Sequence, residues 1–232
     1  MKKFNVTGIC VPEKNYMVDI SDKTGKIIQM VEDGKYFTIN RARQYGKTTT
    51  LAALYHELKD RYTVLFLSFE GVSDESFSDS ASFVNMFLEK IRLELEFSKG
   101  AEQPTGFQTG QNDIADLGKE DAFEYLSKKI TSLCKNSEKE VILMIDEVDK
   151  SSDNQVFLNF LGMLRTKFLF HQTGRDITFK SVILASVHDI KNLKLKIRPE
   201  DERIYNSPWN IAADFTIDMS LSMAGIQGML ED

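Results

Sequence analysis

The stretch "KYFTINRARQYGKTTTLAALYHELKD", residues 35–60, decides how this sequence folds. Its first six residues, 35–40, are rich in aromatic and β-branched side chains and predict a short strand. Beyond residue 47, apolar side chains recur at the spacing of an amphipathic helix, at Leu51, Leu54, Tyr55 and Leu58. A loop that ends in Gly-Lys-Thr joins the two segments. This order of strand, loop and helix is that of a phosphate-binding loop.

The tripeptide Gly46-Lys47-Thr48 has the residue types that such a loop requires. Gly46 lets the main chain approach a ligand where a Cβ atom would collide with it. Lys47, at the mouth of the site, would reach the β- and γ-phosphates, and Thr48 would offer its hydroxyl to Mg²⁺. Backbone N–H groups and the helix N-terminus would hold the phosphates. We therefore expect a nucleotide to contact the whole loop, namely Arg41, Ala42, Arg43, Gln44, Tyr45, Gly46, Lys47, Thr48 and Thr49.

One position departs from the usual pattern of a phosphate loop, G-x-x-x-x-G-K-[ST]. The first glycine of that pattern is replaced here by Arg41. Ordinary residue usage also produces a lone G-K-[ST] by chance. The placement of the tripeptide between a strand and a helix removes most of those chance cases.

Three further apolar runs, at 62–69, 140–147 and 181–187, predict strands that are buried on both faces of a sheet. Helical periodicity predicts helices between them, over 80–97, over 123–133 and from about 153 to 168. Ser151 or Ser152 is the expected N-cap of the last helix. Strands that alternate with helices favour an α/β fold, a doubly wound and mostly parallel sheet with helices on both faces.

The second chemical motif is VILMIDEVDK, residues 141–150, in which an apolar strand runs into Asp146-Glu147. Ligands of parallel α/β sheets bind at the carboxyl ends of the strands. Asp146 would hold Mg²⁺, directly or through water, and Glu147 would orient or deprotonate the attacking water. The alternative is that the two acids cap the next helix or lie in solvent. Together the two motifs have the form of Walker A and Walker B motifs.

The strand at 181–187 supplies a third residue of interest. One strand lies between the lysine motif and the acidic strand, and one follows the acidic strand. This is the order found in P-loop ATPases with an additional glutamate, the AAA+ and STAND groups, whose next strand carries a polar residue near the γ-phosphate. Ser186 is the first candidate for that residue and His188 the second. The alternative is a serine that simply ends a strand.

Composition restricts the class of protein. The chain has 232 residues, a net charge of −6 and ordinary apolar content, so its overall charge does not indicate binding to nucleic acid. The basic run at 191–198 is interpreted as a solvated face, and the alternative is a local basic patch that contacts nucleic acid. No apolar run approaches the roughly 18 residues of a membrane span, and the N-terminus has no apolar signal region. Cys10 and Cys134 show no metal spacing, which favours a cytoplasmic setting.

Four stretches together resemble the bacterial "predicted AAA-ATPase" family over nearly the whole chain: NRARQYGKTTT, VILMIDEVDK, SVILASVHDIKNLKLKIRPEDE and YNSPWNIAADF. The resemblance implies an ATPase that uses ATP and Mg²⁺. In that family a non-glycine residue usually begins the phosphate loop, in a form such as R-P-R-R-F-G-K-[ST]. Ala42 replaces the proline of that form here. Arg41 or Arg43 would then add positive charge near the nucleotide, the alternative being exposed loop charges.

The resemblance also implies a domain organisation. Residues 1–34 would form an N-terminal segment in which residues 16–20 border the adenine, although an N-terminal core helix would give the same pattern. Residues 35–205 would form the ATPase core, and residues 206–232 the start of an incomplete, lid-like C-terminal region. Similar proteins are usually longer and carry a helical lid, often followed by a nuclease-like effector domain.

We therefore expect Mg²⁺-dependent hydrolysis of ATP to ADP and phosphate. The alternatives are a nucleotide-binding switch with little turnover, a helicase, because DEVD is similar to the DExD box, and a small-molecule kinase. ATPases of this kind complete their site with an arginine from a lid or from a neighbouring subunit, so self-association is one expected source. Within the chain, Arg175, Arg198 and Arg203 are either substitutes or exposed charges.

Overall fold

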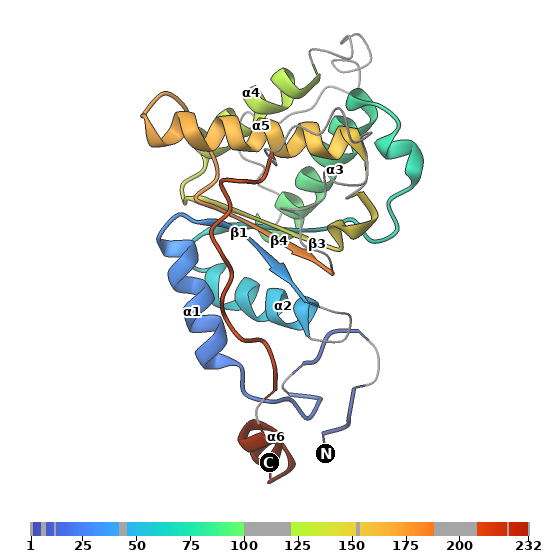
Figure 1. Cartoon of the computed structure of the whole chain (residues 1–232), viewed down its shortest axis with the longest axis vertical. Helices are drawn as coiled ribbons and strands as arrows, with labels where there is room; N and C mark the ends of the chain where they lie inside the picture. Colours follow the sequence, from blue (N-terminus) through green and yellow to red (C-terminus); the bar gives the residue numbers. More distant parts are fainter. Residues whose placement is uncertain are drawn as a thin grey trace, which may run out of the picture.

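The structure is a computed structural model that describes residues 2–5, 8–11, 13–41, 46–99, 122–151, 154–187, 208–221 and 223–231. A single parallel sheet lies at its centre, with helices on both faces (Figure 1). This confirms the α/β fold class predicted from the alternation of strands and helices. No helix in these ranges is both long enough and apolar enough to cross a membrane.

The sheet contains four parallel strands in the order β1-β4-β3-β2. Their bounds are Tyr36–Asn40 (β1), Thr63–Ser68 (β2), Val141–Asp146 (β3) and Ser181–Ser186 (β4). Each lies within one residue of a predicted strand. All six residues of β3 and of β4 are buried, as expected for strands covered on both faces.

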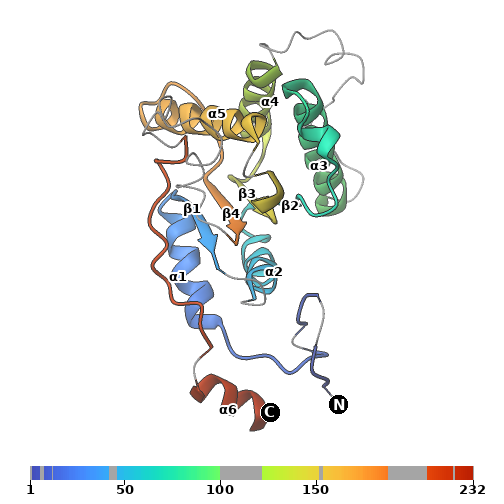
Figure 2. The same cartoon turned by 45° about the vertical axis from the view of Figure 1, so that its right-hand side comes forward.

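The helices divide between the two faces (Figures 1 and 2). One face is covered by α1 (Ser21–Glu32) and α2 (Lys47–Leu58). The other is covered by α3 (Ser80–Lys99), α4 (Ala122–Asn136) and α5 (Gln155–Gln172). Two short 3₁₀ helices, η1 (Asp74–Phe77) and η2 (Val148–Ser151), follow β2 and β3, and α6 (Met223–Glu231) lies near the C-terminus.

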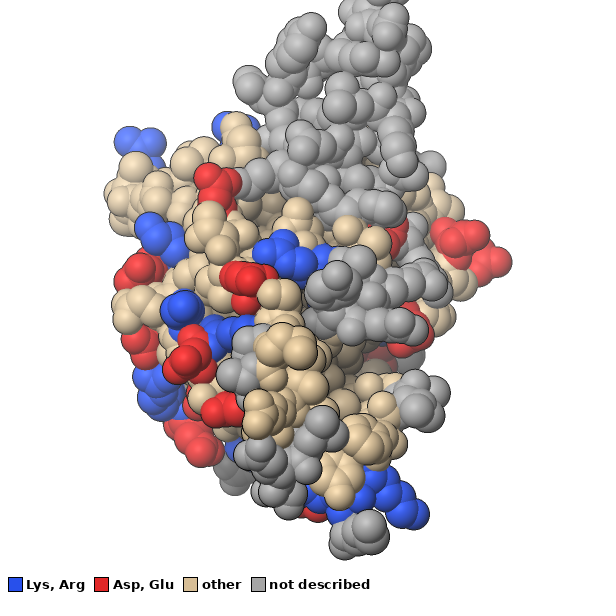
Figure 3. Space-filling view, turned by 60° about the horizontal axis from the view of Figure 1, so that its bottom comes forward, with Lys and Arg blue, Asp and Glu red and all other residues tan. Residues whose placement is uncertain are grey.

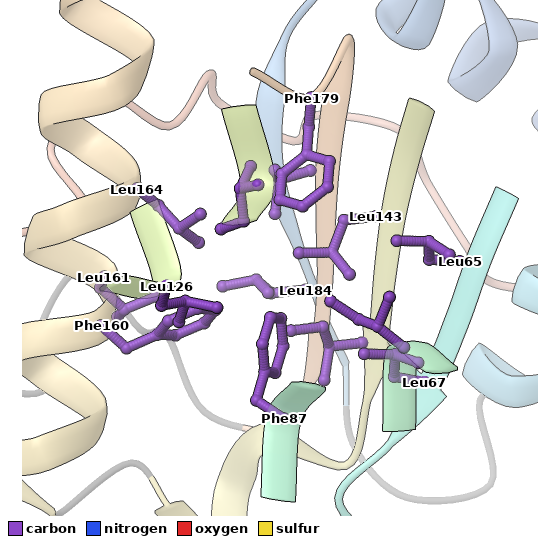
Figure 4. Packing of buried hydrophobic residues seen from close by; sticks show 14 of the residues in the cluster. Leu65, Leu67, Phe87, Leu126, Leu143, Phe160, Leu161, Leu164, Phe179 and Leu184 are labelled. Atoms are coloured by element: carbon purple, nitrogen blue, oxygen red, sulfur yellow. The ribbon is translucent and has the colours of Figure 1, made fainter. Parts of the chain in front are cut away.

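Successive residues of a strand point to opposite faces of the sheet, so each strand contributes different side chains to the two hydrophobic layers between the sheet and its helices. In β2, Leu65 and Leu67 pack toward α3, α4 and α5, while Val64 packs toward α1 and α2. Figure 4 shows the first layer, in which side chains from the sheet meet those from the helices: Leu65, Leu67, Leu143, Leu184, Phe87, Leu126, Phe160, Leu161 and Leu164.

The expected N-cap of α5 was wrong. Asn154, and not Ser151 or Ser152, precedes the helix in an extended conformation, and its Oδ1 accepts a hydrogen bond from the Val156 amide at 2.7 Å. Ser151 instead ends η2. The Asn154 side chain also donates to the Phe77 carbonyl at 2.9 Å, so the same residue ties the start of α5 to η1.

A buried ion pair joins α4, α5 and the turn before β4. The Lys167 side chain is 2% exposed, and its ammonium donates to Asp176 Oδ2 and to Thr131 Oγ1, each at 2.7 Å. Burial raises the pKa of Asp176, but hydrogen bonds from Lys167 and Thr131 outweigh it and hold that pKa below its ordinary value. This cluster is a structural element of the helical layer.

The C-terminal segment, which we define as residues 208–221, lies along the outer edge of β1 (Figure 2). The Ala213 amide donates to the Tyr36 carbonyl at 2.7 Å in a parallel bridge, and the buried Trp209 indole donates to Thr38 Oγ1 at 3.0 Å. The lid-like region expected over 206–232 thus includes a stretch that covers the edge strand. From there the chain reaches α6, close to the N-terminus (Figures 1 and 2).

Candidate functional site

Three predicted site elements meet at the carboxyl edge of the sheet. Asn40, the last residue of β1, is in register with Ser186, the last residue of β4. The Arg41 amide then donates to the Ser186 carbonyl at 3.1 Å, so the phosphate loop starts directly beside the end of β4. Asp146 ends β3, the neighbouring strand on the other side of β4. The parallel topology therefore assembles residues that are far apart in the sequence.

Gly46 caps α2 in a left-handed conformation, with φ of 71° and ψ of 22°. A side chain is strained at such a φ, and no described atom lies within 4 Å of the place where its Cβ would stand. The glycine is thus required here by its backbone conformation. Its carbonyl accepts the Thr50 amide at 2.8 Å and closes the first turn of the helix.

Lys47 is the first residue of α2 and is only 6% exposed. The expectation that it lies at an open mouth was wrong, because its ammonium turns back and donates to the Arg41 carbonyl at 2.8 Å. The lysine therefore closes the loop onto its own first residue.

Thr48 and Asp146 are in direct contact. The Thr48 hydroxyl donates to Asp146 Oδ2 at 2.6 Å, and Asp146 Oδ1 accepts the Glu147 amide at 2.9 Å. Asp146 is 3% exposed. A buried carboxylate is thus held by two donors, with a hydroxyl oxygen beside it, and this pair has the hard oxygen ligands that Mg²⁺ prefers.

Glu147 has the one positive φ, 56°, among the non-glycine residues that the structure describes. Such a conformation costs on the order of 1 kcal/mol for a residue with a side chain, and outliers of this kind gather at functional sites. Here it turns the chain sharply out of β3 into η2. Glu147 is partly exposed, whereas the adjacent Asp146 is buried.

Ser186 is 1% exposed and lies at the very end of β4. The next residue, Val187, donates its amide to both carboxylate oxygens of Asp149, at 2.7 and 2.8 Å. Asp149 therefore ties η2 to the end of β4, a role that our reading of the motif missed. The third acid of D-E-V-D was the signal that could have identified it. His188 lies outside the described residues.

Four of the expected loop contacts also lie outside the described residues: Ala42, Arg43, Gln44 and Tyr45. Arg41 is described, and its guanidinium donates to the Asn40 carbonyl at 2.7 Å and to the Ile217 carbonyl at 3.0 Å. It also lies over the Phe215 ring, 5.8 Å from the centroid. No signal in the sequence links Arg41 to residues so distant along the chain.

A pocket of about 580 Å³ adjoins the phosphate loop and falls within the range of small-molecule sites. Three segments form most of its lining: the N-terminal stretch, the first turn of α2 and the C-terminal segment. The lining residues from these are Cys10, Tyr16, Met17, Val18, Ile20, Gly46, Thr49, Thr50, Met219, Ser220 and Leu221, and Asn5, Lys23 and Met229 complete it.

Hydrogen bonds connect the walls of this pocket. The Cys10 amide donates to Thr49 Oγ1 at 3.4 Å, which joins the N-terminal stretch to α2. The Lys23 ammonium donates to the Ser220 carbonyl, which joins α1 to the C-terminal segment. The N-terminal core helix begins at Ser21, so residues 16–20 precede it, and Tyr16, Met17, Val18 and Ile20 of this stretch line the pocket.

Of the three arginines considered as substitutes, Arg175 is an exposed residue in the turn that precedes β4. Since β4 carries Ser186 at its far end, Arg175 lies at the opposite edge of the sheet, roughly 20 Å from the phosphate loop at 3.3 Å per strand residue. The interpretation as an exposed charge therefore holds for Arg175. Arg198 and Arg203 lie outside the described residues, as does the basic run at 191–198.

A model of the AAA-like domain family matches residues 14–217. Among solved structures, Cdc6p from Pyrobaculum aerophilum is similar with 12% identity and a TM-score of 0.41, over 78% of this chain and 41% of that one. Drosophila ORC bound to DNA is similar with 13% identity and a TM-score of 0.38, over 78% of this chain and 81% of that one.

The chain thus spans less than half the length of Cdc6p. A search of curated proteins found no match to the sequence. The family match covers far more than half of the chain and includes the phosphate loop, Asp146 and Ser186. The chain therefore belongs to the AAA-like domain family.

Proposed function

We propose that this domain binds ATP with Mg²⁺ and hydrolyses it to ADP and phosphate. The observation that carries the proposal is the 2.6 Å contact between Thr48 Oγ1 and Asp146 Oδ2. It joins the residue that follows the phosphate-loop lysine to the buried acid of β3. These are the two protein groups that a P-loop ATPase uses to hold its metal ion.

The phosphates would lie at the N-terminus of α2, where backbone N–H groups and the helix dipole favour negative charge. Lys47 already lies there, with its ammonium on the Arg41 carbonyl. A phosphate oxygen is a stronger, charged acceptor than a carbonyl. We expect the ammonium to move from Arg41 to the β- and γ-phosphates when nucleotide binds.

The oxygen pair of Thr48 and Asp146 fits an octahedral Mg²⁺ site. Mg–O distances of 2.0–2.1 Å place adjacent ligands roughly 2.9 Å apart, so the 2.6 Å between these two oxygens needs to widen only slightly. When bound, Mg²⁺ would neutralise charge on the β- and γ-phosphate oxygens. Thr48 and Asp146 would orient it, and water and phosphate oxygens would complete its coordination.

The adenine base of the nucleotide would occupy the pocket beside the phosphate loop. Its walls include Val18, which is 8% exposed, and Met219, which is 4% exposed, and these suit the faces of a purine ring. The backbone groups of Met17 and Val18 make no hydrogen bond to another described residue. These backbone N–H and C=O groups could hydrogen-bond the edge of adenine, which is the role expected for residues 16–20.

Glu147 and Ser186 would act on the γ-phosphate side. Glu147 follows Asp146 and is partly exposed, so its carboxylate can accept a proton from the attacking water. Ser186 ends the strand between β1 and β3 and would place a hydroxyl near the γ-phosphate. Its contact with the phosphate loop through the Arg41 amide supports this assignment.

We expect turnover to be slow unless an arginine is supplied by a neighbouring copy or by a lid. Arg41 is engaged with the C-terminal segment, and Arg175 lies at the wrong edge of the sheet. An arginine in trans contributes roughly 10³–10⁵ in rate in related chemistry, so a chain without it should turn over well below about 1 s⁻¹. Self-association should raise the rate.

A cytoplasmic setting completes the proposal, supported by the free thiols of Cys10 and Cys134. On the face shown in Figure 3, positive and negative side chains are interspersed over the described surface. The net charge is −6. These features favour nucleotide over nucleic acid as the ligand of the domain.

The experiment is steady-state phosphate release with Mg-ATP across a range of protein concentrations. Glu147→Gln keeps size and hydrogen bonding but removes the base, so turnover should fall by about 10²-fold while ATP still binds. Glu138→Gln, an exposed acid in the turn before β3, serves as the matched control. Equal rates in the unsubstituted chain and in Glu147→Gln would contradict the assigned base, and binding without turnover would indicate a nucleotide switch.

A further inference from the structure

Within the C-terminal segment, residues 213–219 follow a turn at 208–211 and have a regular inward face. Residues 213, 215, 217 and 219 are partly or fully buried, whereas the residues between them are exposed. Phe215 stacks on Phe37 of β1 with ring centroids 5.9 Å apart, and Met219 is 4% exposed in the layer of α1 and α2. The far end of this segment, residues 219–221, lines the pocket.

Arg41 is the junction between this segment and the phosphate loop. Its backbone amide binds the end of β4, and its backbone carbonyl accepts Lys47. Its guanidinium donates to the Ile217 carbonyl and lies over the Phe215 ring. A planar guanidinium suits this combination because it can donate in several directions while stacking on an aromatic face.

Charge on the C-terminal segment complements this junction. The amide and hydroxyl of Ser220 lower the pKa of Asp218, and the positive charges of Lys23 and Arg41 lower it further. Lys23 also donates to the Ser220 carbonyl. Two cations, Lys23 from α1 and Arg41 from the start of the phosphate loop, thus contact the four-residue stretch 217–220 next to the pocket.

We propose that Arg41 is a positioning residue that holds the C-terminal segment as a wall of the nucleotide pocket, so that nucleotide binding and attachment of this segment strengthen each other. This inference rests on the proposed function. It explains why an arginine stands at the first position of the loop. The side chain fastens the segment, and the phosphates are left to Lys47 and the loop backbone.

The coupling follows from linkage. A nucleotide that contacts the C-terminal segment only when the segment is attached must stabilise the attached state. Detaching the segment must therefore lower the affinity for the nucleotide by the same factor. The C-terminal segment lines the pocket and not the phosphate loop. The loss of affinity on detaching it should therefore not depend on how many phosphates the ligand carries. A direct contact between Arg41 and phosphate would give a loss that grows with phosphate number.

The test uses the full 232-residue chain with Arg41→Ala, Arg41→Lys and, as control, Arg61→Ala. Arg61 also has an ion pair and an aromatic ring under its guanidinium, with Glu32 and Tyr62, but lies on the surface away from the pocket. Affinities for ATP, ADP and AMP are measured by competition against a fluorescent ADP analogue. Amide hydrogen exchange of residues 208–221 is measured with and without ADP.

Arg41→Ala should lower the affinities for ATP, ADP and AMP by a similar factor, about three- to thirtyfold. It should also speed amide hydrogen exchange of residues 208–221. Arg41→Lys should recover part of both effects, and Arg61→Ala should change neither. In the unsubstituted chain, ADP should slow exchange of the same residues. If Arg41→Ala folds poorly, Phe215→Leu removes the ring under the guanidinium while keeping an apolar contact, and it should give the same uniform loss.

Three results would overturn the inference. A loss confined to ATP, or growing from AMP to ATP, would make Arg41 a phosphate contact. Unchanged affinities in Arg41→Ala, with binding intact in the unsubstituted chain, would show that the segment is not coupled to the site. Absence of nucleotide binding by the unsubstituted chain would instead contradict the proposed function, and the inference with it.

Discussion

The Thr48 hydroxyl donates to the Asp146 carboxylate across 2.6 Å, although the two residues are 98 positions apart in the sequence. This contact fixes the first turn of α2 against the end of β3. Asp146 is buried and also accepts the Glu147 amide, so its orientation is set before any ligand arrives. Pre-oriented oxygen ligands of this kind lower the cost of binding a metal ion.

The Mg²⁺ dependence of ATP binding tests this pair. Thr48→Val removes the hydroxyl with little change of shape, and Asp146→Asn removes the charge. Both should reduce the gain in ATP affinity on adding Mg²⁺ by roughly tenfold or more. Thr166→Val, on the exposed face of α5, is the matched control. Titrations with Mg²⁺ and with a chelator measure the gain, and an undiminished gain in both site variants would exclude these residues as ligands.

Alkylation of cysteine tests the position of the pocket. Cys10 is partly exposed and lines it, whereas burial raises the pKa of the Cys134 thiol to about 12 and keeps that thiol protonated. Iodoacetamide should therefore modify Cys10 and spare Cys134, and ADP should slow the reaction at Cys10. Mass spectrometry of tryptic peptides follows both sites, with Cys10→Ser as control. If saturating ADP leaves the rate of reaction at Cys10 unchanged, the adenine base binds elsewhere.

The buried pair of Lys167 and Asp176 gives a prediction for stability against pH. The pKa of Asp176 is lowered in the folded chain, so its contribution is present above the unfolded value of about 3.9 and is lost as pH falls through the folded value. Asp176→Asn leaves the ammonium of the buried Lys167 side chain without its counter-charge and should cost about 3–5 kcal/mol of unfolding free energy near pH 7.

Denaturant titrations between about pH 3 and pH 7 check this prediction, because they measure the free energy of unfolding at each pH. Asp176→Asn should lose less stability than the unsubstituted chain over the acid part of this range. Lys167→Met combined with Asp176→Asn should recover much of the loss near pH 7, since it removes the unpaired cation. An identical acid dependence in the unsubstituted chain and in Asp176→Asn would show that other carboxyl groups determine it.

The sequence predicts the local parts of this structure well. The four strands follow apolar runs bounded by polar residues, and α2 follows its apolar period, because local pattern and tertiary burial agree there. Asp146 was predicted from the rule that α/β sheets bind ligands at the carboxyl ends of their strands, and Ser186 from the strand order of the AAA+ and STAND ATPases.

The features that sequence reasoning missed depend on three-dimensional contact. Asn154 caps α5 in place of a serine because η2 uses the residues directly after β3. Lys47 is buried because its ammonium has a carbonyl acceptor within the loop. The bond from Arg41 to Ile217 spans 176 positions, and no local pattern encodes it. The alternation of apolar and polar residues from 213 to 219 in the sequence is the pattern of a half-buried strand, and we had not used it.

The central claim is that the loop before α2 binds phosphate through Lys47, and calorimetric titration with Mg-ATP tests it most directly. The unsubstituted chain should bind one nucleotide, and Lys47→Ala should lose most of the affinity, about ten- to a hundredfold, with a circular dichroism spectrum that shows intact folding. Lys59→Ala, at the opposite end of the same helix, should bind as the unsubstituted chain does. Equal affinity in Lys47→Ala and in the unsubstituted chain would contradict the account.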